Sequence, residues 1–141
     1  MGGLFAFRTQ REPWGGSRGL FLFPIEVSVN HLKRICPKWG DEFQDILDNF
    51  WLGRCFFLES TSLEEEKHVL EAIKLGYQDC LDNPEDCKSK YFRDPDYFDP
   101  YLAKYKKLID LIKEEIRDIE RGKLILQEDG SAIINEDFKE D

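Results

Sequence analysis

The sequence predicts an α+β domain in which a mostly antiparallel sheet is packed by about four helices. Three observations lead to this prediction. A long amphipathic helix is expected at 100–121, strand-like apolar runs occur near both ends of the chain, and shorter helical patterns lie between them. Strands and helices do not alternate regularly, which argues against a doubly wound sheet. We expect a single domain at 1–135, followed by an acidic C-terminal tail at 136–141.

The first expected elements are two strands, Leu4–Thr9 and Gly19–Val27, which are rich in phenylalanine and bounded by glycine. The continuous apolar run in the second strand is typical of a strand buried on both faces. Pro24 fits an edge or a bulge better than a central position in a sheet. The polar, glycine-rich segment at 10–19 is expected to form the long loop between the two strands.

Two helices and a strand are expected next. Ser28 is placed to cap a short helix that Pro37 ends. A second helix begins at Asp41, carries an apolar stripe at helical spacing, and is closed by Gly53. That stripe consists of Phe43, Ile46, Leu47, Phe50 and Trp51. The apolar centre of Arg54–Glu59 then predicts a buried strand.

A third helix has the clearest start signal in the chain. The Thr-Ser pair at 61–62 lies three residues before a pair of glutamates, which is the pattern of a capping box. The helix is expected to run to about Leu81, where an Asn-Pro pair follows at 83–84 and ends it. The polar segment 82–90 is expected to be a loop.

The long helix at 100–121 is defined by its two ends and by one apolar stripe. Asp99 is a suitable N-cap, Pro100 suits the first helical position, and Gly122 suits the left-handed residue after the end. The stripe consists of Tyr101, Leu102, Tyr105, Leu108, Ile109, Ile112, Ile116 and Ile119. We expect this face to pack on the core; a helix that mediates dimerisation is the alternative.

Two short apolar runs after the long helix predict a C-terminal β-hairpin. The runs are Lys123–Gln127 and Ser131–Asn135, and an Asp-Gly pair at 129–130 lies between them. The acidic tail beyond the hairpin is expected to fray, with Phe138 able to fold back on the domain.

The charge balance limits the classes of partner. The chain carries 20 basic and 29 acidic residues, for a net charge of -9. A negative protein is poorly suited to nucleic acid or to an anionic membrane surface, so neither is expected as a partner. A basic protein partner is favoured instead, because opposite charges speed encounter. No apolar run reaches the roughly 20 residues of a membrane span, and the N-terminus lacks a signal peptide pattern, so we expect a cytoplasmic protein.

The cysteines and histidines indicate neither a metal site nor a cofactor. The four cysteines form no CxxC pair, and we expect reduced, inert thiols; a bridge between Cys80 and Cys87 is the alternative in an oxidising compartment. His31 and His68 have no second ligand at the spacing that zinc requires. No nucleophile motif is present, so no catalytic residue is assigned and a non-enzymatic protein is favoured.

The segment 91–101, reading YFRDPDYFDPY, is the strongest candidate for a binding site. Aromatic side chains mixed with acids and prolines are costly to expose without a partner, and tyrosine and phenylalanine are enriched at interfaces. The candidate partner-binding residues are Tyr91, Phe92, Asp94, Asp96, Tyr97 and Phe98. The alternative is a loop that uses these aromatic side chains to attach itself to the core.

The sequence therefore favours an acidic protein-binding module that inhibits or neutralises a basic protein or enzyme. Immunity proteins and anti-defence proteins share this combination of small size and negative charge. One alternative is a small-ligand or nucleotide-binding protein that uses the glycine-rich loop at 15–19. Its candidate ligand-binding residues are Trp14, Gly16, Ser17 and Arg18. That loop is expected to enter a strand, whereas phosphate loops enter a helix. A second alternative is an accessory subunit that packs on a larger complex through the long helix or an edge strand.

Overall fold

The computed structural model describes residues 2–50 and 54–139 and confirms the α+β class. In this part of the chain there are five α-helices, a three-stranded sheet and a two-stranded hairpin. The helices are α1 (Arg18–Ile35), α2 (Pro37–Asp48), α3 (Leu63–Asp82), α4 (Pro84–Tyr91) and α5 (Phe98–Glu120). The strands are β1 (Gly3–Ala6), β2 (Trp14–Gly16), β3 (Cys55–Phe57), β4 (Leu124–Leu126) and β5 (Ala132–Ile134). Two 3₁₀ turns, η1 (Leu58–Ser60) and η2 (Pro95–Tyr97), precede α3 and α5.

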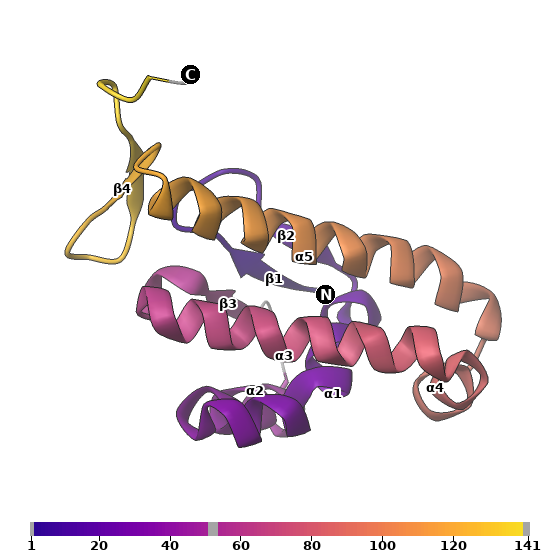
Figure 1. The fold of residues 1–141 in the computed structure, drawn as a ribbon. Coiled ribbons are helices and arrows are strands. Elements are labelled where there is room, and N and C mark those ends of the chain that lie inside the picture. The colour runs from indigo at the N-terminus through magenta and orange to yellow at the C-terminus, as the bar shows by residue number, and fades with distance from the viewer. Residues whose placement is uncertain (1, 51–53, 140–141) are drawn as a thin grey trace.

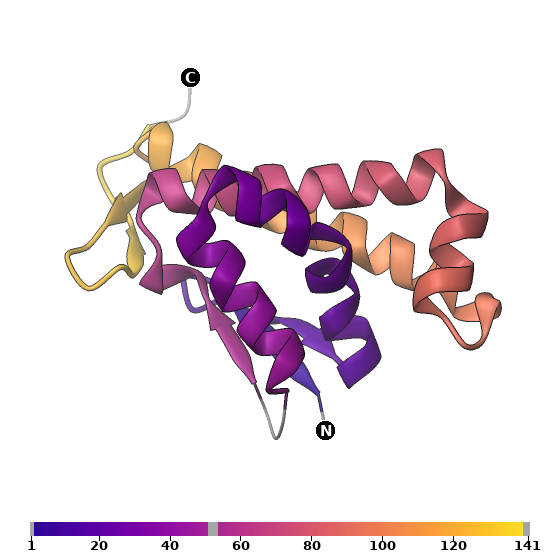
Figure 2. The same ribbon diagram turned by 90° about the horizontal axis from the view of Figure 1, so that it is seen from below.

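The long helices α3 and α5 lie side by side, with the hairpin at one end of the pair and α4 at the other (Figure 1). Helices α1 and α2 pack against each other, and α1 packs against α3, as the view from below shows (Figure 2). Among the described residues, no helix is long and apolar enough to cross a lipid bilayer.

The prediction of a mostly antiparallel sheet is wrong, because the three-stranded sheet is mixed. Its order is β2-β1-β3, with β1 antiparallel to β2 and parallel to β3. Strands β1 and β2 are joined by a loop that reverses the chain, whereas α1 and α2 lie between β2 and β3. The crossover through α1 and α2 returns the chain to the end of the sheet where β1 starts, so β3 runs parallel to β1.

The predicted strand at Gly19–Val27 is instead the first half of α1. Ser17 caps this helix by accepting a hydrogen bond from the Leu20 backbone N–H at 3.3 Å. Nearly every residue from Leu20 to Val29 is buried, because α1 is covered by other elements on most of its circumference. A helix that is buried all round shows no amphipathic period, so its sequence does not differ from that of a buried strand.

The predicted short helix at 28–36 is the second half of α1, so Ser28 lies inside the helix and is not a cap. Pro24 also lies inside α1, where a proline has no N–H to donate. The Ser28 hydroxyl donates to the Pro24 carbonyl one turn earlier. The helix ends before Pro37, as expected.

Helix α2 starts at Pro37, earlier than the predicted Asp41, because proline at the first position suits a helix start. It ends at Asp48, so Phe50 lies beyond it. The predicted contributions of Trp51 and Gly53 fall outside the described residues. Strand β3 lies within the predicted segment 54–59.

The capping box at the start of α3 is confirmed. The Glu65 backbone N–H donates to the Ser62 hydroxyl at 3.1 Å, and the Ser62 backbone N–H donates to the Glu65 carboxylate at 2.8 Å. The pKa of Glu65 is lowered to about 2, first by the second of these bonds and further by Trp39 and Lys38. The loop predicted at 82–90 is wrong, because Pro84–Tyr91 forms α4. Acidic side chains in its first turn and lysines in its last turn favour this short polar helix through its dipole.

The long helix and the hairpin are confirmed. Helix α5 begins at Phe98, so Asp99 lies in its first turn and does not cap it. Gly122 adopts the expected positive φ of 84° after the helix end. In the hairpin, β4 and β5 pair antiparallel, and Gly130 at the tip has a φ of 90°. The Arg121 guanidinium carbon lies 5.7 Å from the centroid of the Phe138 ring, so Phe138 does fold back.

Cys80 and Cys87, the pair for which we considered a bridge, lie next to each other where α3 meets α4. Both are buried thiols, and their sulfur atoms are 2.7 Å apart. Burial raises the pKa of both thiols, which disfavours the reactive thiolate. Cys36 and Cys55 are half-buried.

We expect iodoacetamide to modify Cys36 and Cys55 in the native protein before it modifies Cys80 or Cys87. The reason is that the last two are shielded and hold their protons. Mass spectrometry of peptides after timed labelling measures the order, and labelling in urea gives the unfolded reference. Equal rates for the two pairs in the native protein would contradict this prediction.

Candidate functional site

Two segments that the sequence analysis considered as separate sites meet at one hollow of about 600 Å³. The hollow lies between the N-terminal half of α1 and the connection from α4 to α5. From α1 come Arg18, Gly19, Leu22, Phe23 and Glu26. From the end of α4, the connection and the start of α5 come Tyr91, Phe92, Arg93, Asp94, Tyr97 and Tyr101. We call this feature the aromatic hollow.

Aromatic rings in edge-to-face contact form the base of the aromatic hollow. The Phe92 ring lies 5.0 Å from Phe23, 5.6 Å from Tyr101 and 5.7 Å from Phe98, measured between ring centroids. The Tyr97 ring lies 5.9 Å from Tyr101 at the rim. Edge-to-face contacts of this kind hold aromatic side chains in defined orientations, so the base of the hollow is preformed.

Charged side chains of both signs surround these rings. Arg18 and Arg93 supply positive charge, and Glu26 and Asp94 supply negative charge. The Arg18 guanidinium carbon lies 5.2 Å from the centroid of the Phe50 ring, a cation–π contact that orients it. Partial desolvation raises the pKa of the Glu26 carboxyl. The hollow can therefore contact both cationic and anionic groups beside its rings.

The structure places the predicted partner-binding residues in three kinds of position. Tyr91, Phe92, Asp94 and Tyr97 line the hollow, and the Tyr97 side chain is 56% exposed. Asp96 is exposed on η2 beside them, where its backbone N–H donates to the Asp94 carboxylate at 3.0 Å. Phe98 is only 3% exposed and belongs to the core.

The predicted ligand-binding residues do not gather in one place. Among Trp14, Gly16, Ser17 and Arg18, only Arg18 lines the hollow. Trp14 is buried and donates its indole N–H to the Lys104 carbonyl at 2.8 Å, and Gly16 lies in β2. The Ser17 hydroxyl caps α1 and lies 3.4 Å from the Tyr101 hydroxyl. The expectation that this loop enters a strand is wrong, because it enters α1.

Five residues that line the hollow were not among the predicted candidates: Leu22, Phe23, Glu26, Arg93 and Tyr101. Phe23 and Glu26 were assigned to a strand, which would place them on opposite faces because they are three residues apart. Tyr101 belongs to the apolar stripe of α5, so its spacing indicated only a core residue. Helical numbering of α1 would have placed Gly19, Phe23 and Glu26 on one face.

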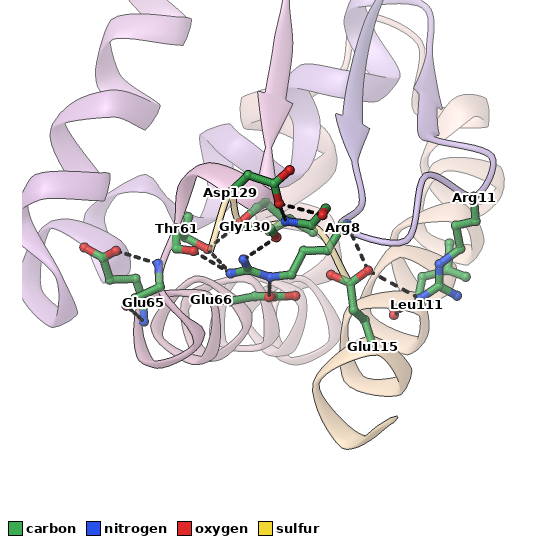
Figure 3. Close-up of polar contacts among 12 residues, drawn as sticks. Arg8, Arg11, Thr61, Glu65, Glu66, Leu111, Glu115, Asp129 and Gly130 are labelled. Carbon is green, nitrogen blue, oxygen red and sulfur yellow. Dashed lines mark hydrogen bonds and ion pairs between the residues drawn. The ribbon is translucent and has the colours of Figure 1, made fainter. Parts of the chain in front are cut away.

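Apart from the aromatic hollow, a cluster of polar side chains lies in the interior around Arg8 (Figure 3). The Arg8 side chain is 1% exposed and forms an ion pair with Glu66, with Nε to Oε1 at 2.7 Å. Its remaining nitrogens donate to the Gly130 carbonyl at 2.8 Å and to the Thr61 carbonyl at 2.6 Å. The Arg8 backbone N–H donates to the Glu115 carboxylate at 3.1 Å. We call these residues the Arg8 cluster.

Glu66 and Glu115 form a pair of interacting carboxyl groups within this cluster. Burial first, and then the charge of Glu115, raise the pKa of Glu66 to about 8, although Arg8 opposes the shift. Glu66 Oε2 and Glu115 Oε1 are buried, and neither has a donor among the described residues. A protonated Glu66 can donate a hydrogen bond to Glu115, and this bond also raises the pKa of Glu66.

The Arg8 cluster is closed to substrates. The side chains of Arg8, Glu66 and Glu115 are at most 1% exposed. Paired carboxylates at an active site need access to a reacting bond, and these have none. The cluster therefore has a structural role. The available signal in the sequence was Glu66, which falls between Leu63 and Val69 on the inward stripe of α3.

In residues 2–50 and 54–139, no group of three or more histidine, cysteine or acidic side chains is arranged to hold a metal ion. His31 instead forms a hydrogen bond with Asp79, with Nε2 to Oδ2 at 2.7 Å.

The chain matches no protein-family model, no curated protein and no solved structure. Its function therefore has to be inferred from the geometry of its own residues.

Replacing Glu66 by glutamine should flatten the pH dependence of stability. The folded-state pKa of Glu66, about 8, lies above its usual value of 4.5, so the folded protein retains a proton that the unfolded chain releases. The resulting stabilisation is complete below the lower pKa and is lost as the pH rises through the higher one. The wild-type free energy of unfolding should therefore fall by at most about 1.4 kcal/mol per pH unit across this interval. Glu66→Gln keeps an acceptor for Arg8 and has no proton to lose.

Urea unfolding at intervals from about pH 5 to about pH 9 measures this difference. Glu64→Gln is the matched control, because Glu64 is exposed on the same helix turn and should leave the wild-type slope unchanged. A wild-type slope that persists in Glu66→Gln would contradict the assignment.

Proposed function

We propose that the chain is a protein-binding module that acts through the aromatic hollow on a basic protein. The observation that carries this proposal is the meeting of two remote segments, Arg18–Glu26 and Tyr91–Tyr101, at a single hollow with an exposed tyrosine at its rim. Binding there would cover a functional surface of the partner, so the module would act as an inhibitor or neutraliser.

The lining of the hollow favours a protein as the ligand. Tyrosine and arginine are the residues most enriched at the energetic centres of protein interfaces. Tyr97 offers a large amphipathic surface that loses little conformational entropy on binding, because Tyr101 already contacts it. Arg18 and Arg93 add hydrogen-bond donors for carboxylates or carbonyls of the partner.

The charge around the hollow favours a basic partner. The exposed carboxylates of Asp94, Asp96 and Asp99 lie on the segment that carries Tyr97. The net charge of the whole chain is -9, which attracts a cationic protein over long range. Complementary charge of this kind raises the association rate more than the final affinity.

Replacing Tyr97 by alanine should abolish capture of a basic partner without changing the melting temperature. Tyr97 is 56% exposed, so its removal leaves no cavity. Phe98→Ala should instead destabilise the fold by about 3 kcal/mol, because Phe98 is a buried core residue. Affinity capture from the native host lysate at low and high salt measures binding, and thermal unfolding measures stability.

Phe57→Ala provides the matched control, since Phe57 is an exposed aromatic residue on β3, outside the hollow, and its removal should leave capture intact. Capture that is unchanged in Tyr97→Ala, or that is insensitive to salt, would contradict the proposal.

Binding of a small anionic ligand is the second candidate function, and one observation favours it. The glycine-rich loop leads into the N-terminus of α1, and Arg18 and Arg93 line the same hollow. Under this hypothesis, inorganic phosphate or a nucleotide should raise the melting temperature of the wild type. Arg18→Ala should abolish that rise, whereas Arg34→Ala, near the other end of α1, should retain it. No rise with any phosphate compound would rule this candidate out.

A further inference from the structure

The C-terminal hairpin exposes more aliphatic surface than a short water-facing hairpin needs. Its two strands carry no charged residue and no proline. Exposed fractions are 43% for Ile125, 52% for Ile133 and 74% for Ile134. Natural sheet edges usually carry lysine, proline or a covering element that prevents pairing with another chain. Strand β5 itself carries neither lysine nor proline.

The strand register identifies which backbone groups point out of the hairpin. Leu124 lies opposite Ile134, and Ile125 lies opposite Ile133. The Gln127 N–H donates to the Ser131 carbonyl at 2.8 Å, and the Asn135 N–H donates to the Lys123 carbonyl at 2.9 Å. Bonded and non-bonded pairs alternate along an antiparallel ladder, so the N–H and C=O of Ile134 point away from β4.

On this outer edge of β5, the first residue, Ala132, pairs with Arg8, which follows β1 in the chain. There the Ala132 N–H donates to the Arg8 carbonyl at 3.0 Å. Further along, within the described part of the chain, no strand pairs with β5 on that side. The edge around Ile134 is therefore open for hydrogen bonding.

A cleft of about 770 Å³ runs along the same edge. Its walls are Thr9–Arg11, the last turns of α5 and the residues of β5. Among the charged side chains that line it, Arg8 and Arg11 already face carboxylates. Asp118 is 8% exposed, and in the described part of the chain its ion-pair contact is with Arg117 Nε at 3.8 Å. Glu114, Glu136 and Lys123 also line the cleft.

We propose that the outer edge of β5 binds an extended segment of another protein by strand addition. The backbone of Ile134 would supply the hydrogen bonds, and the cleft would hold alternate side chains of the segment. We expect basic residues on that segment, because carboxylates lie both in the cleft (Asp118 and Glu136) and at the hairpin tip (Glu128 and Asp129). The same carboxylates disfavour a second copy of this chain, because antiparallel pairing would bring like charges together.

This surface is separate from the aromatic hollow. The hairpin and the α4–α5 corner lie at opposite ends of α5 (Figure 1). Strand addition therefore does not depend on the function proposed for the hollow, and a variant at either site leaves the other intact.

The test is a fluorescence anisotropy titration with the labelled peptide KKVTVTVKK. This peptide combines strand propensity with basic ends, and we expect saturable binding. Ile134→Pro removes the outward N–H, and an edge strand tolerates proline at that position, so binding should weaken by about tenfold or more. Leu126→Pro removes an equivalent outward N–H from the β4 edge and is the matched control; it should bind like the wild type.

Three further measurements make the result decisive. Ile134→Lys, which keeps the backbone and opposes the basic peptide, should also weaken binding. The peptide EEVTVTVEE should bind at least about tenfold more weakly than KKVTVTVKK. Hydrogen exchange at the Ile133 amide, which points to β4, verifies that the hairpin persists in each variant, and exchange at the Ile134 amide should slow when KKVTVTVKK binds.

The proposal would be overturned if KKVTVTVKK does not bind. It would also be overturned if Leu126→Pro, with its hairpin intact, loses as much peptide affinity as Ile134→Pro. A dimer in sedimentation that Ile134→Pro dissociates would assign the edge to a second copy and overturn the proposed partner. Tyr97→Ala should bind the peptide like the wild type, so failure at the hollow and failure at the edge are distinguishable.

Discussion

The buried ion pair between Arg8 and Glu66 is the interaction on which the rest of the fold depends. The Arg8 guanidinium bonds to Glu66 on α3, to Thr61 two residues before that helix, and to Gly130 at the tip of the C-terminal hairpin. The Arg8 backbone N–H bonds to Glu115 on α5. A buried ion pair contributes little net stability, because desolvation offsets the attraction. Its directional bonds admit one arrangement only, so the pair selects how the hairpin docks. Gly130 completes this fit, because a Cβ there would lie 1.9 Å from the Glu59 carbonyl oxygen.

Helix α5 links this fixed point to the opposite end of the molecule. Near its C-terminus, Glu115 joins the Arg8 cluster; at its N-terminus, Phe98 packs against Phe92 below the aromatic hollow. In between, the Tyr105 hydroxyl donates to the Ile73 carbonyl at 2.5 Å and holds α5 against α3. A preformed hollow and a preformed strand edge are thus presented on one rigid scaffold. Rigid presentation reduces the entropy lost on binding, which would favour binding at either of the two proposed surfaces.

The sequence predicted those elements whose local signals agree. Helices α3 and α5 combine a periodic stripe with clear start or stop residues, and the hairpin has an Asp-Gly turn. It failed for α1, whose burial on most sides removes the period, and for α4, which is short and polar and is marked mainly by Pro84 at its start and by charge placement. The mixed sheet depends on which strands meet after a helical crossover, and no local pattern encodes that. Four of the candidate residues suggested by the unusual composition of 91–101 line the hollow, whereas the lining on α1 depends on the helix itself. The partners of Arg8 are up to 122 residues away in the chain, beyond the reach of any spacing argument.

The position of β1 has a consequence for synthesis on the ribosome. Strand β1 is the central strand of the three-stranded sheet, and Arg8, which follows it, bonds to the carbonyl of Gly130, 122 residues later in the chain. Until Gly130 leaves the ribosomal exit tunnel, β1 and Arg8 cannot complete their native contacts, because Arg8 still lacks one of its hydrogen-bond acceptors. The early helices can pack meanwhile, because their contacts are closer in sequence. Folding of the nascent chain should therefore end with a single late closing step, and a chain stalled or truncated before the hairpin would present chaperones and proteases with an open interior.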